Sequence, residues 1–356
     1  MDQPITMHFK PWKLNGHLIQ SNESLAQLEE KVFFQAPEGL KWLINELYKL
    51  SNGKIPFLSI RTSGSTGLPK EVQFTIEELV ASADLSIKAL GLIADSNLLL
   101  CLPVSGVGGL MMLVRAMRVG GKLITVTPSS VIQPSMFHHQ KIRWASMTPH
   151  QLVNSQESFK YVENILIGGA FLSDTTLSGL LKKPKRILES YGMTETLSHI
   201  AIRERYPNNQ RFFKILDGIK ISRADNGALC IETPHLVTKR HRTNDEVELV
   251  DESHFCLIGR LDDVINTGGI KIHPRAVEEI LRSNRLEKEF FVCGTPHPEL
   301  GSQITVVINA INDSELSSVE EFIEALDWPQ YHKPRKVIAR NFVYTATGKI
   351  DKRATL

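Results

Sequence analysis

The sequence predicts an α/β protein with a large N-terminal part, residues 1–261, and a small C-terminal domain, residues 262–356. Short apolar runs alternate with helical stretches from Phe57 to about residue 205, a pattern typical of α/β layering. Strand-like runs separated by polar turns follow and predict a small β-rich subdomain. After about Asp262, a helix and two more strand runs predict an α+β domain.

The helical stretches are recognised from apolar residues that recur every three or four positions. Two such stretches lie in the first fifty residues, and a third, residues 74–90, follows the first strand run. The strand candidates of the large part each end in small or polar residues: 57–62, 97–104, 121–128, 141–149, 164–170 and 186–192. Functional loops are expected at the C-terminal ends of these strands.

The later elements follow the same logic. Residues 218–234 and 245–260 read as antiparallel strands with polar turns. In the small domain Pro274 opens a helix, because proline suits the first helical position. Strand runs at 290–294 and 303–310 follow, and then a helix around Glu320–Leu326.

Composition excludes several classes of protein. Hydrophobic residues make up 42% and charged residues 22%, which excludes disordered, collagenous and coiled-coil chains. The formal net charge of +2 gives no electrostatic reason to expect binding to nucleic acid or an anionic membrane. The uncharged stretch Ser96–Val114 contains proline and glycines, so we interpret it as a strand, a turn and a buried helix start.

Cysteines and the N-terminal segment indicate a cytoplasmic protein. The four cysteines are scattered without a Cys-x-x-Cys pair, so neither a disulfide framework nor a thiolate zinc site is expected. The first residues show no basic segment followed by an apolar run, so no secretory signal is predicted.

The strongest local motif is Thr62-Ser-Gly-Ser-Thr-Gly-Leu-Pro-Lys70, between a predicted strand and a predicted helix. Glycines let the backbone approach a ligand closely, while hydroxyl and amide groups donate to phosphate oxygens. Lys70 adds a positive charge. The Walker A pattern is absent, and no G-x-G-x-x-G follows a strand. The motif predicts a phosphate-binding loop, with a flexible linker as the alternative.

A second motif is Glu189-Ser-Tyr-Gly-Met-Thr-Glu195. Tyr191 can stack on a flat base, Thr194 offers a hydroxyl, and Glu195 offers a hard oxygen ligand for Mg²⁺. The alternative is a plain strand–turn–helix junction, with the acid near a helix N-terminus.

Two further motifs lie in the C-terminal third. The glycine-rich segment 259–274 could also be a surface loop that joins two domains, and Lys349 within 345–351 could also be an exposed turn lysine.

In this order, the four motifs resemble the adenylate-forming superfamily of acyl-CoA synthetases, luciferases and peptide-synthetase adenylation domains, from about Phe57 to Arg353. The resemblance implies an ATP-dependent, AMP-forming carboxylate–CoA ligase. Such an enzyme adenylates an acid with ATP and Mg²⁺, and the thiol of CoA then attacks the acyl-adenylate. The resemblance also implies that residues 262–356 form a mobile lid with its hinge near Asp262.

The same resemblance implies a role for each site residue. Lys349, Glu195 and Thr194 would be catalytic, with Glu195 as the Mg²⁺ ligand, and Asp245 with its basic partner Arg260 would bind the ribose. The remaining implied ATP or AMP contacts are Thr62, Ser63, Gly64, Ser65, Thr66, Gly67, Lys70, Gly168, Gly169, Ala170, Ser190, Tyr191 and Gly192. The implied CoA tunnel contains Gly268 and Gly269.

Within the superfamily, the runs Tyr191–His199 and Thr267–Pro274 resemble the o-succinylbenzoate–CoA ligases of menaquinone biosynthesis. That acid is a dianion, so its pocket needs cationic or hydrogen-bonding groups for the second carboxylate. Gly106, Ser198 and His199 are expected in the acyl pocket, and Arg115 is a further candidate for the second carboxylate. A buried, hydrogen-bonded core histidine is the alternative for His199.

The chain also departs from the superfamily pattern. The phosphate loop begins already at Thr62, so an N-terminal subdomain of the usual family is expected to be missing. Gly106 stands where a histidine is usual, while Glu71 and Asn244 replace glycines. Three alternatives stay open: a CoA ligase for another aryl or acyl acid, a degenerate nucleotide-binding regulator, and a kinase-like phosphotransferase. The expected partner is a small carboxylic acid, with a homodimer as a further expectation.

Overall fold

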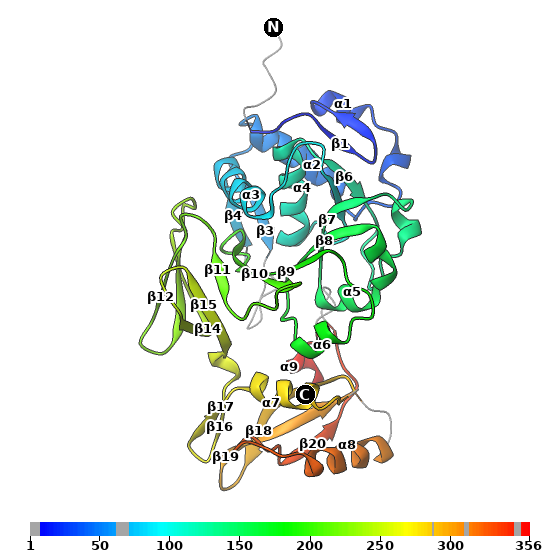
Figure 1. Cartoon of the computed structure of the whole chain (residues 1–356). Coiled ribbons are helices and arrows are strands. Elements are labelled where there is room, and N and C mark those ends of the chain that lie inside the picture. Colours follow the sequence, from blue (N-terminus) through cyan, green and yellow to red (C-terminus); the bar gives the residue numbers. More distant parts are fainter. Residues whose placement is uncertain (1–7, 62–70, 287, 310–312, 345–349) are drawn as a thin grey trace. The chain divides into compact units, whose positions relative to one another are not determined.

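The computed structural model describes residues 8–61, 71–286, 288–309, 313–344 and 350–356. The chain divides into two compact units. The first comprises Met1–Leu172, Leu180–Lys220 and Ile231–His241, and the second comprises Ser173–Gly179, Ile221–Cys230 and Arg242–Leu356. Helices and strands alternate along the first unit, so the predicted α/β class is confirmed (Figure 1).

Parallel strands form the centre of the first unit. Its strands follow the order β11-β10-β9-β8-β7-β5-β6-β1-β2, in which the pairs from β9 to β1 are parallel and the pairs at both ends are antiparallel. These strands are β1 Trp12–Leu14, β2 His17–Ile19, β5 Asn97–Leu100, β6 Lys122–Thr125, β7 Ile142–Met147, β8 Val162–Ile167, β9 Arg186–Met193, β10 Ser198–Tyr206 and β11 Phe213–Ile215. A separate hairpin pairs β3 Leu58–Arg61 with β4 Glu71–Phe74.

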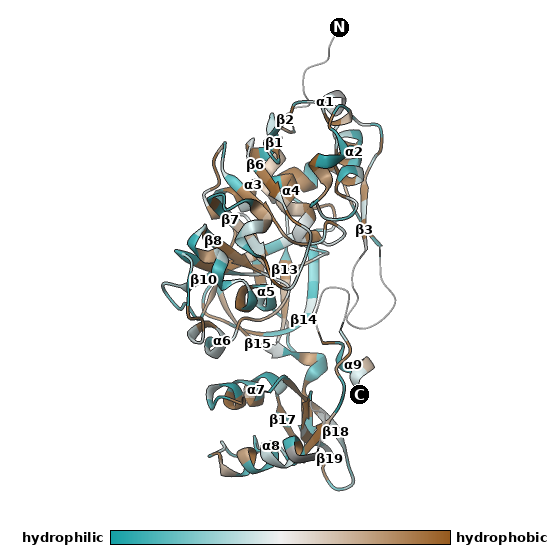
Figure 2. Cartoon of the chain, turned by 90° about the vertical axis from the view of Figure 1, so that its right-hand side faces the viewer, coloured by the Kyte–Doolittle hydropathy of each residue, from teal (hydrophilic) through white to brown (hydrophobic). Residues whose placement is uncertain are grey.

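Helices surround this sheet because their apolar faces bury against it. Leu98, Leu99 and Leu100 of β5 are fully buried, and Figure 2 colours much of the central strands and of α4 as hydrophobic. The helices of the first unit are α1 Asn22–Ala26, α2 Leu40–Ser51, α3 Ile76–Leu90, α4 Val107–Val119 and α5 Pro149–Asn154, with 3-10 turns at Glu30–Phe33, Pro134–Phe137 and Gln156–Lys160.

Local sequence signals fix the two helices nearest the candidate site. Helix α3 begins with a capping box, in which Thr75 and Glu78 each bond the other's backbone N–H, and it ends at Gly91 with a φ of 62°. Helix α4 begins after Gly106 and ends at Gly120. Gly109 lies in its first turn, where a Cβ would lie far inside contact distance of the Pro103 carbonyl oxygen.

The second unit contains all or most of the residues of two groups of strands. One follows the order β12-β13-β14-β15: Lys220–Arg223, Ala228–Glu232, Arg240–Leu249 and His254–Arg260. The other follows the order β17-β16-β19-β18, with β20 beside β19: β16 Ile265–Thr267, β17 Ile270–Ile272, β18 Phe290–His297, β19 Gly301–Ile308 and β20 Lys336–Ala339. The helices are α6 Asp174–Ser178, α7 Pro274–Ser283, α8 Asp313–Ala325 and α9 Lys352–Thr355, with a 3-10 turn at Leu261–Asp263.

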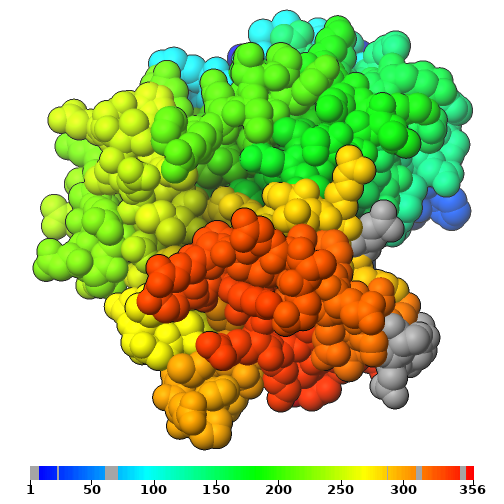
Figure 3. Space-filling model, turned by 60° about the horizontal axis from the view of Figure 1, so that its bottom comes forward, coloured from blue at the N-terminus to red at the C-terminus, as the bar shows by residue number. Residues whose placement is uncertain are grey.

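The C-terminal strands and helices have a core of their own. Helix α7 begins at Pro274 as predicted, and its Val277 and Leu281 are fully buried against β18 and β19. In the space-filling view of Figure 3 the orange and red residues gather into one body. The predicted boundary between residues 261 and 262, and the movement of 262–356 as a lid, stay predictions.

Two sequence-based expectations for the N-terminal fifty residues need correction. The first helical stripe forms the short α1 and a 3-10 turn, not one continuous helix. The strands β1 and β2 were not expected, because each has only three residues and shows no periodicity. Among the described residues, no helix is long and apolar enough to cross a membrane.

We expect Gly109→Ala to lower the free energy of unfolding by about 1–3 kcal/mol, because the added methyl group collides with rigid backbone at Pro103. Gly106→Ser is the matched control. At Gly106 a Cβ has only the Pro103 oxygen nearby, at 3.8 Å, and serine is a favoured N-cap residue. Thermal and urea unfolding of both variants check this, and equal stability of the two would contradict the steric argument.

Candidate active site

The second motif forms a tight hairpin turn. Strand β9 ends at Met193 and β10 begins at Ser198, so the strand–turn–helix alternative for Glu195 is wrong. The Thr196 hydroxyl oxygen accepts from the Met193 N–H at 3.0 Å and lies 2.9 Å from the Ser198 carbonyl oxygen. A Cβ on Gly192 would overlap the backbone of Ser198, so glycine is required at this crossing of the strands. The turn therefore holds the residues on either side of it in fixed positions.

Glu195 in this turn faces a cavity of about 270 Å³. The carboxylate of Glu78 also lines this cavity, but both of its oxygens accept hydrogen bonds from backbone N–H groups: that of Thr75 at 2.8 Å and that of Val237 at 2.7 Å. Glu195 is half-buried. The cavity is lined by Phe57, Val72, Gln73, Phe74, Thr75, Glu78, Glu195, Leu236, Val237, Thr238 and His241.

These residues fit Mg²⁺ held mainly by a substrate. In the part of the chain that the structure describes, no three metal-ligating side chains form a group. Mg²⁺ is commonly bound by one or two carboxylates together with phosphate oxygens and waters. Glu195 supplies such a carboxylate, in a cavity whose lining includes Val72, Gln73 and Phe74, just after the predicted phosphate loop. Burial lowers the pKa of His241, which keeps this neighbour neutral at pH 7.

The expected adenine-binding residues lie at the ends of β8 and β9. Gly168, Gly169 and Ala170 follow β8, and the Ser190 hydroxyl of β9 donates to the Ile167 carbonyl at 2.8 Å. A Cβ on Gly168 would lie 2.9 Å from that hydroxyl oxygen, so these segments pack closely. The Tyr191 ring, half-buried, lies 5.8 Å from the ring of Phe213 in a tilted arrangement.

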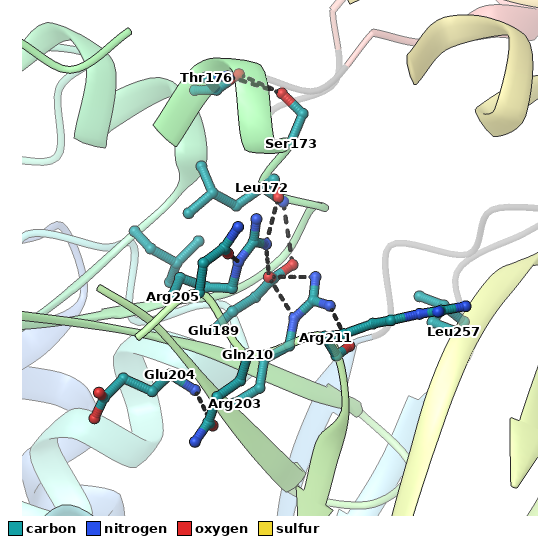
Figure 4. Close-up of polar contacts among 12 residues, drawn as sticks. Leu172, Ser173, Thr176, Glu189, Arg203, Glu204, Arg205, Gln210, Arg211 and Leu257 are labelled. Atoms are coloured by element: carbon teal, nitrogen blue, oxygen red, sulfur yellow. Dashed lines mark hydrogen bonds and ion pairs between the residues drawn. The ribbon is translucent and has the colours of Figure 1, made fainter. Parts of the chain in front are cut away.

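A buried charge cluster joins these same segments. Glu189 of β9 accepts from Arg203 Nε at 2.9 Å and Nη2 at 2.7 Å, and it also pairs with Arg205 (Figure 4). Its other oxygen accepts from the Leu172 N–H at 3.1 Å. All three charged residues are at most 6% exposed. The guanidinium of Arg203 also lies over the rings of Phe171 and Phe213.

This cluster was missed from the sequence. Arg203 and Arg205 are two positions apart, so on a strand they share a face. That spacing is the signal that could have paired them with Glu189, which lies directly opposite Arg203 in the β9–β10 register.

The expected ribose-binding pair is found within the second unit. Asp245 of β14 lies opposite Arg260 of β15, with 3.7 Å between Arg260 Nη1 and Asp245 Oδ1. Arg260 also forms a two-pronged bond to Asp262, with Nε–Oδ1 at 2.8 Å and Nη2–Oδ2 at 2.7 Å. The hydrogen bonds from Arg260 hold the pKa of Asp262 below its ordinary value. One guanidinium thus serves both the expected ribose acid and the expected hinge residue.

The other expected residues are of two kinds: those that the structure describes and those outside the described residues. Gly268 and Gly269 form the exposed turn between β16 and β17, each with positive φ, while Gly106 precedes α4, and Ser198 and His199 are buried at the start of β10. Thr62, Ser63, Gly64, Ser65, Thr66, Gly67, Lys70 and Lys349 lie outside the described residues.

Comparison with known families identifies a family match that covers most of the first unit. A family model described as AMP-binding enzyme matches residues 29–238. Among curated proteins, the 2-succinylbenzoate–CoA ligase of Listeria monocytogenes is 26% identical over 336 residues, covering 82% of this chain and 68% of the relative. The enzyme of the same name from Enterococcus faecalis is 23% identical over 370 residues, covering 94% and 73%.

Solved structures show the same fold. An acyl-CoA synthetase (AMP-forming)/AMP-acid ligase II-like protein from Dyadobacter fermentans is 28% identical with a TM-score of 0.58, covering 94% of this chain and 97% of that one. The O-succinylbenzoate Coenzyme A synthetase from Bacillus subtilis, in complex with ATP and magnesium ion, is 22% identical with a TM-score of 0.70, covering 83% and 69%.

We expect Glu189→Gln to lower stability by about 3 kcal/mol or more, because it leaves two buried guanidinium groups without a full counter-charge. Glu163→Gln is the matched control, since Glu163 pairs with Lys185 on the surface and such pairs contribute at most about 1 kcal/mol. Thermal unfolding of both variants measures the difference, and similar small shifts in both would show that the cluster is not under electrostatic constraint.

Proposed function

Because the chain belongs to the AMP-binding enzyme family, we propose that it is an ATP-dependent, AMP-forming carboxylate–CoA ligase whose acid is o-succinylbenzoate. The observation that carries the proposal is the hairpin Tyr191–His199: it brings Glu195 to a cavity whose lining includes the residues just after the phosphate-loop motif. The relatives from Listeria and Enterococcus support the choice of acid by their names.

The proposed reaction has two steps. A carboxylate oxygen of the acid attacks the α-phosphorus of ATP, and the bond to pyrophosphate breaks. The sulfur of CoA then attacks the acyl carbon of the adenylate, AMP leaves, and the thiol proton is released. The first step brings two anions together, so cationic groups must offset the charge that develops on the phosphates.

The residues proposed for the first step have separate roles in binding ATP and offsetting the charge on its phosphates. Mg²⁺, held by Glu195 and phosphate oxygens, would neutralise negative charge on the phosphates. Tyr191 would stack on adenine beside Gly168–Ala170, and Asp245 would accept from the ribose hydroxyls while Arg260 orients it. Thr194 and the loop 62–70 would contact the phosphates. Lys349 would act only during adenylation, and an interaction confined to that transition state raises kcat.

The remaining parts of the proposal concern the CoA-binding path, the cellular compartment and the partners of the protein. Gly268 and Gly269 carry no side chains and would leave room for the pantetheine arm of CoA. We propose that the enzyme acts in the cytoplasm on a small-molecule acid, where its four free cysteines suit a reducing environment. A homodimer and independence from nucleic acid stay predictions.

We expect the wild-type protein to release pyrophosphate and AMP from ATP with o-succinylbenzoate, with sustained turnover only when CoA is present. Benzoate and short fatty acids should give little turnover. Coupled pyrophosphate and AMP assays measure this. Turnover only with another acid would overturn the choice of acid. No turnover with any acid, together with measurable ATP binding, would favour a nucleotide-binding regulator. Formation of ADP would indicate a phosphotransferase.

We expect Glu195→Gln and Lys349→Ala each to reduce adenylation at least about 100-fold, because each removes charge stabilisation of the transition state. Glu77→Gln is the control: Glu77 is an exposed carboxylate in the first turn of α3 and does not line the cavity. Pyrophosphate release with the three variants tests the assignment, which would fail if Lys349→Ala formed adenylate at the wild-type rate.

A further inference from the structure

Three neighbouring strands of the first unit place two aromatic side chains on one face. Tyr191 of β9 lies opposite Ala201 of β10, and Ala201 lies opposite Ile215 of β11. Residues that lie directly opposite each other in antiparallel strands point to the same side of the sheet, as do residues two positions apart along a strand. Phe213 of β11 therefore shares a face with Tyr191, the residue expected to stack on adenine.

The small side chain between these two residues lets their rings meet. Tyr191 and Phe213 lie on strands that are not neighbours, because β10 runs between them. Backbones two strands apart lie roughly 9.5 Å from each other, so the two rings extend towards one another across β10. Their centroids are 5.8 Å apart and their planes are tilted by 57°. Ala201, which is fully buried at this point of β10, leaves the space that the rings need.

The ring of Phe213 is fixed from its other side. Phe213 is buried, and the guanidinium carbon of Arg203 lies 4.5 Å from the centroid of its ring. That guanidinium is held in place, because Nε and Nη2 donate to Glu189 and Nη1 donates to the Arg211 carbonyl at 2.8 Å (Figure 4). A cation over an aromatic ring is attracted to it, and more strongly where water is excluded. The buried charge cluster thus holds Phe213, and Phe213 lies against Tyr191.

Tyr191 is the member of this stack that a ligand can reach. It is half-buried, whereas Phe213 and Arg203 are buried. A half-buried tyrosine without support can rotate about its side-chain torsions, and a base that stacks on it has to restrict that rotation. Contact with a fixed ring restricts the rotation before the ligand arrives, and such preorganisation increases affinity.

We propose that Phe213 is a positioning residue for nucleotide binding: its ring, held by Arg203, sets the plane in which Tyr191 stacks on the adenine base. This inference rests on the proposed function, in which Tyr191 is the adenine contact. Phe213 acts through Tyr191 and contributes to the affinity for the base. The binding of the acid and the adenylation chemistry do not depend on it.

The test compares wild type with Phe213→Leu, which keeps a buried apolar side chain but removes the ring. Phe137→Leu is the matched control: the Phe137 ring is also buried and lies 6.3 Å from the ring of Tyr161, which precedes β8, whereas the expected adenine contacts follow that strand. Tyr191→Ala and the double variant Tyr191→Ala/Phe213→Leu complete a double-mutant cycle. The readouts are the dissociation constants of ATP and tripolyphosphate from calorimetry, kcat and both KM values for pyrophosphate release, and the melting temperature without ligand.

We expect Tyr191→Ala to weaken ATP binding by roughly 5- to 100-fold, the range for loss of a base stacked on an aromatic ring. Phe213→Leu should weaken it by roughly 3- to 10-fold, as for the loss of one aromatic pair. Because stacking is equal in the ground state and the transition state, the KM for ATP should rise while kcat stays unchanged. The KM for the acid, and the affinity for tripolyphosphate, which has no base, should also stay unchanged.

The other two variants separate positioning from general packing. In the Tyr191→Ala background, Phe213→Leu should cause no further loss of ATP affinity, because the residue through which it acts is gone. Phe137→Leu should lower the melting temperature about as much as Phe213→Leu does and leave ATP binding unchanged. The proposal is overturned by a folded Phe213→Leu that binds ATP as wild type does, by an equal loss of ATP affinity in Phe137→Leu, or by a full further loss in the double variant.

Failure of the proposed function gives a different result from failure of this inference. If wild type binds ATP but adenylates no acid, the proposed function fails, and the binding constants of the variants still decide the inference. If wild type turns over but Tyr191→Ala binds ATP as tightly, the inference alone is rejected. If Phe213→Leu does not fold, Phe213→Met replaces it: a loss of ATP affinity that disappears in the Tyr191→Ala background supports the proposal, and full retention of affinity overturns it.

Discussion

The buried carboxylate of Glu189 is the interaction on which the candidate site depends. It ties β9 to β10 through Arg203 and Arg205, and it ties both strands to the segment after β8 through the Leu172 N–H. Breaking a buried pair is far more costly than forming it is favourable, so these three segments are constrained to remain together. The expected adenine contacts are adjacent to the cluster in sequence: Ser190 and Tyr191 follow Glu189, and Ala170 shortly precedes Leu172. A stability element therefore sets the geometry of the proposed nucleotide pocket.

The buried arginines of the first unit differ in how their charge is offset. Arg203 and Arg205 have a carboxylate and aromatic faces, so their charge is offset within the fold. Among the described residues, the polar side chains that contact Arg115 are a hydroxyl, that of Ser198, and a neutral imidazole, that of His199. Protein stability alone favours replacing such an isolated cation by an apolar side chain of similar volume.

Local patterns predicted the parts of the fold that depend on local physics. The apolar spacing predicted a helix over residues 74–90, where α3 lies, and Pro274 predicted the start of α7, because both signals act within a few helical turns. The helical alternative for Glu195 was wrong, since only the pairing of β9 with β10 shows that a strand follows the turn. The bonds of Glu189 to Arg203 and Leu172 likewise connect residues far along the chain. Composition and periodicity carry no information about such partners. The motifs therefore supplied candidate site residues, and the buried groups that hold these residues in place were not predicted.

The ion pair at the proposed hinge is more exposed than the pairs of Glu189. The bidentate bond from Arg260 to Asp262 lies at a partly exposed position, with side chains 37% and 32% exposed. Exposed ion pairs typically contribute about 0–1 kcal/mol, because water screens both charges. The side chains of the Glu189 cluster are 2% to 7% exposed, so the cluster cannot open without leaving charges buried. A hinge at Asp262, as proposed, would have to exchange partners, whereas the wall of the proposed nucleotide pocket would have to stay fixed. Burial thus separates the two tasks: strong, desolvated pairs at Glu189 and a weak, solvated pair at Asp262.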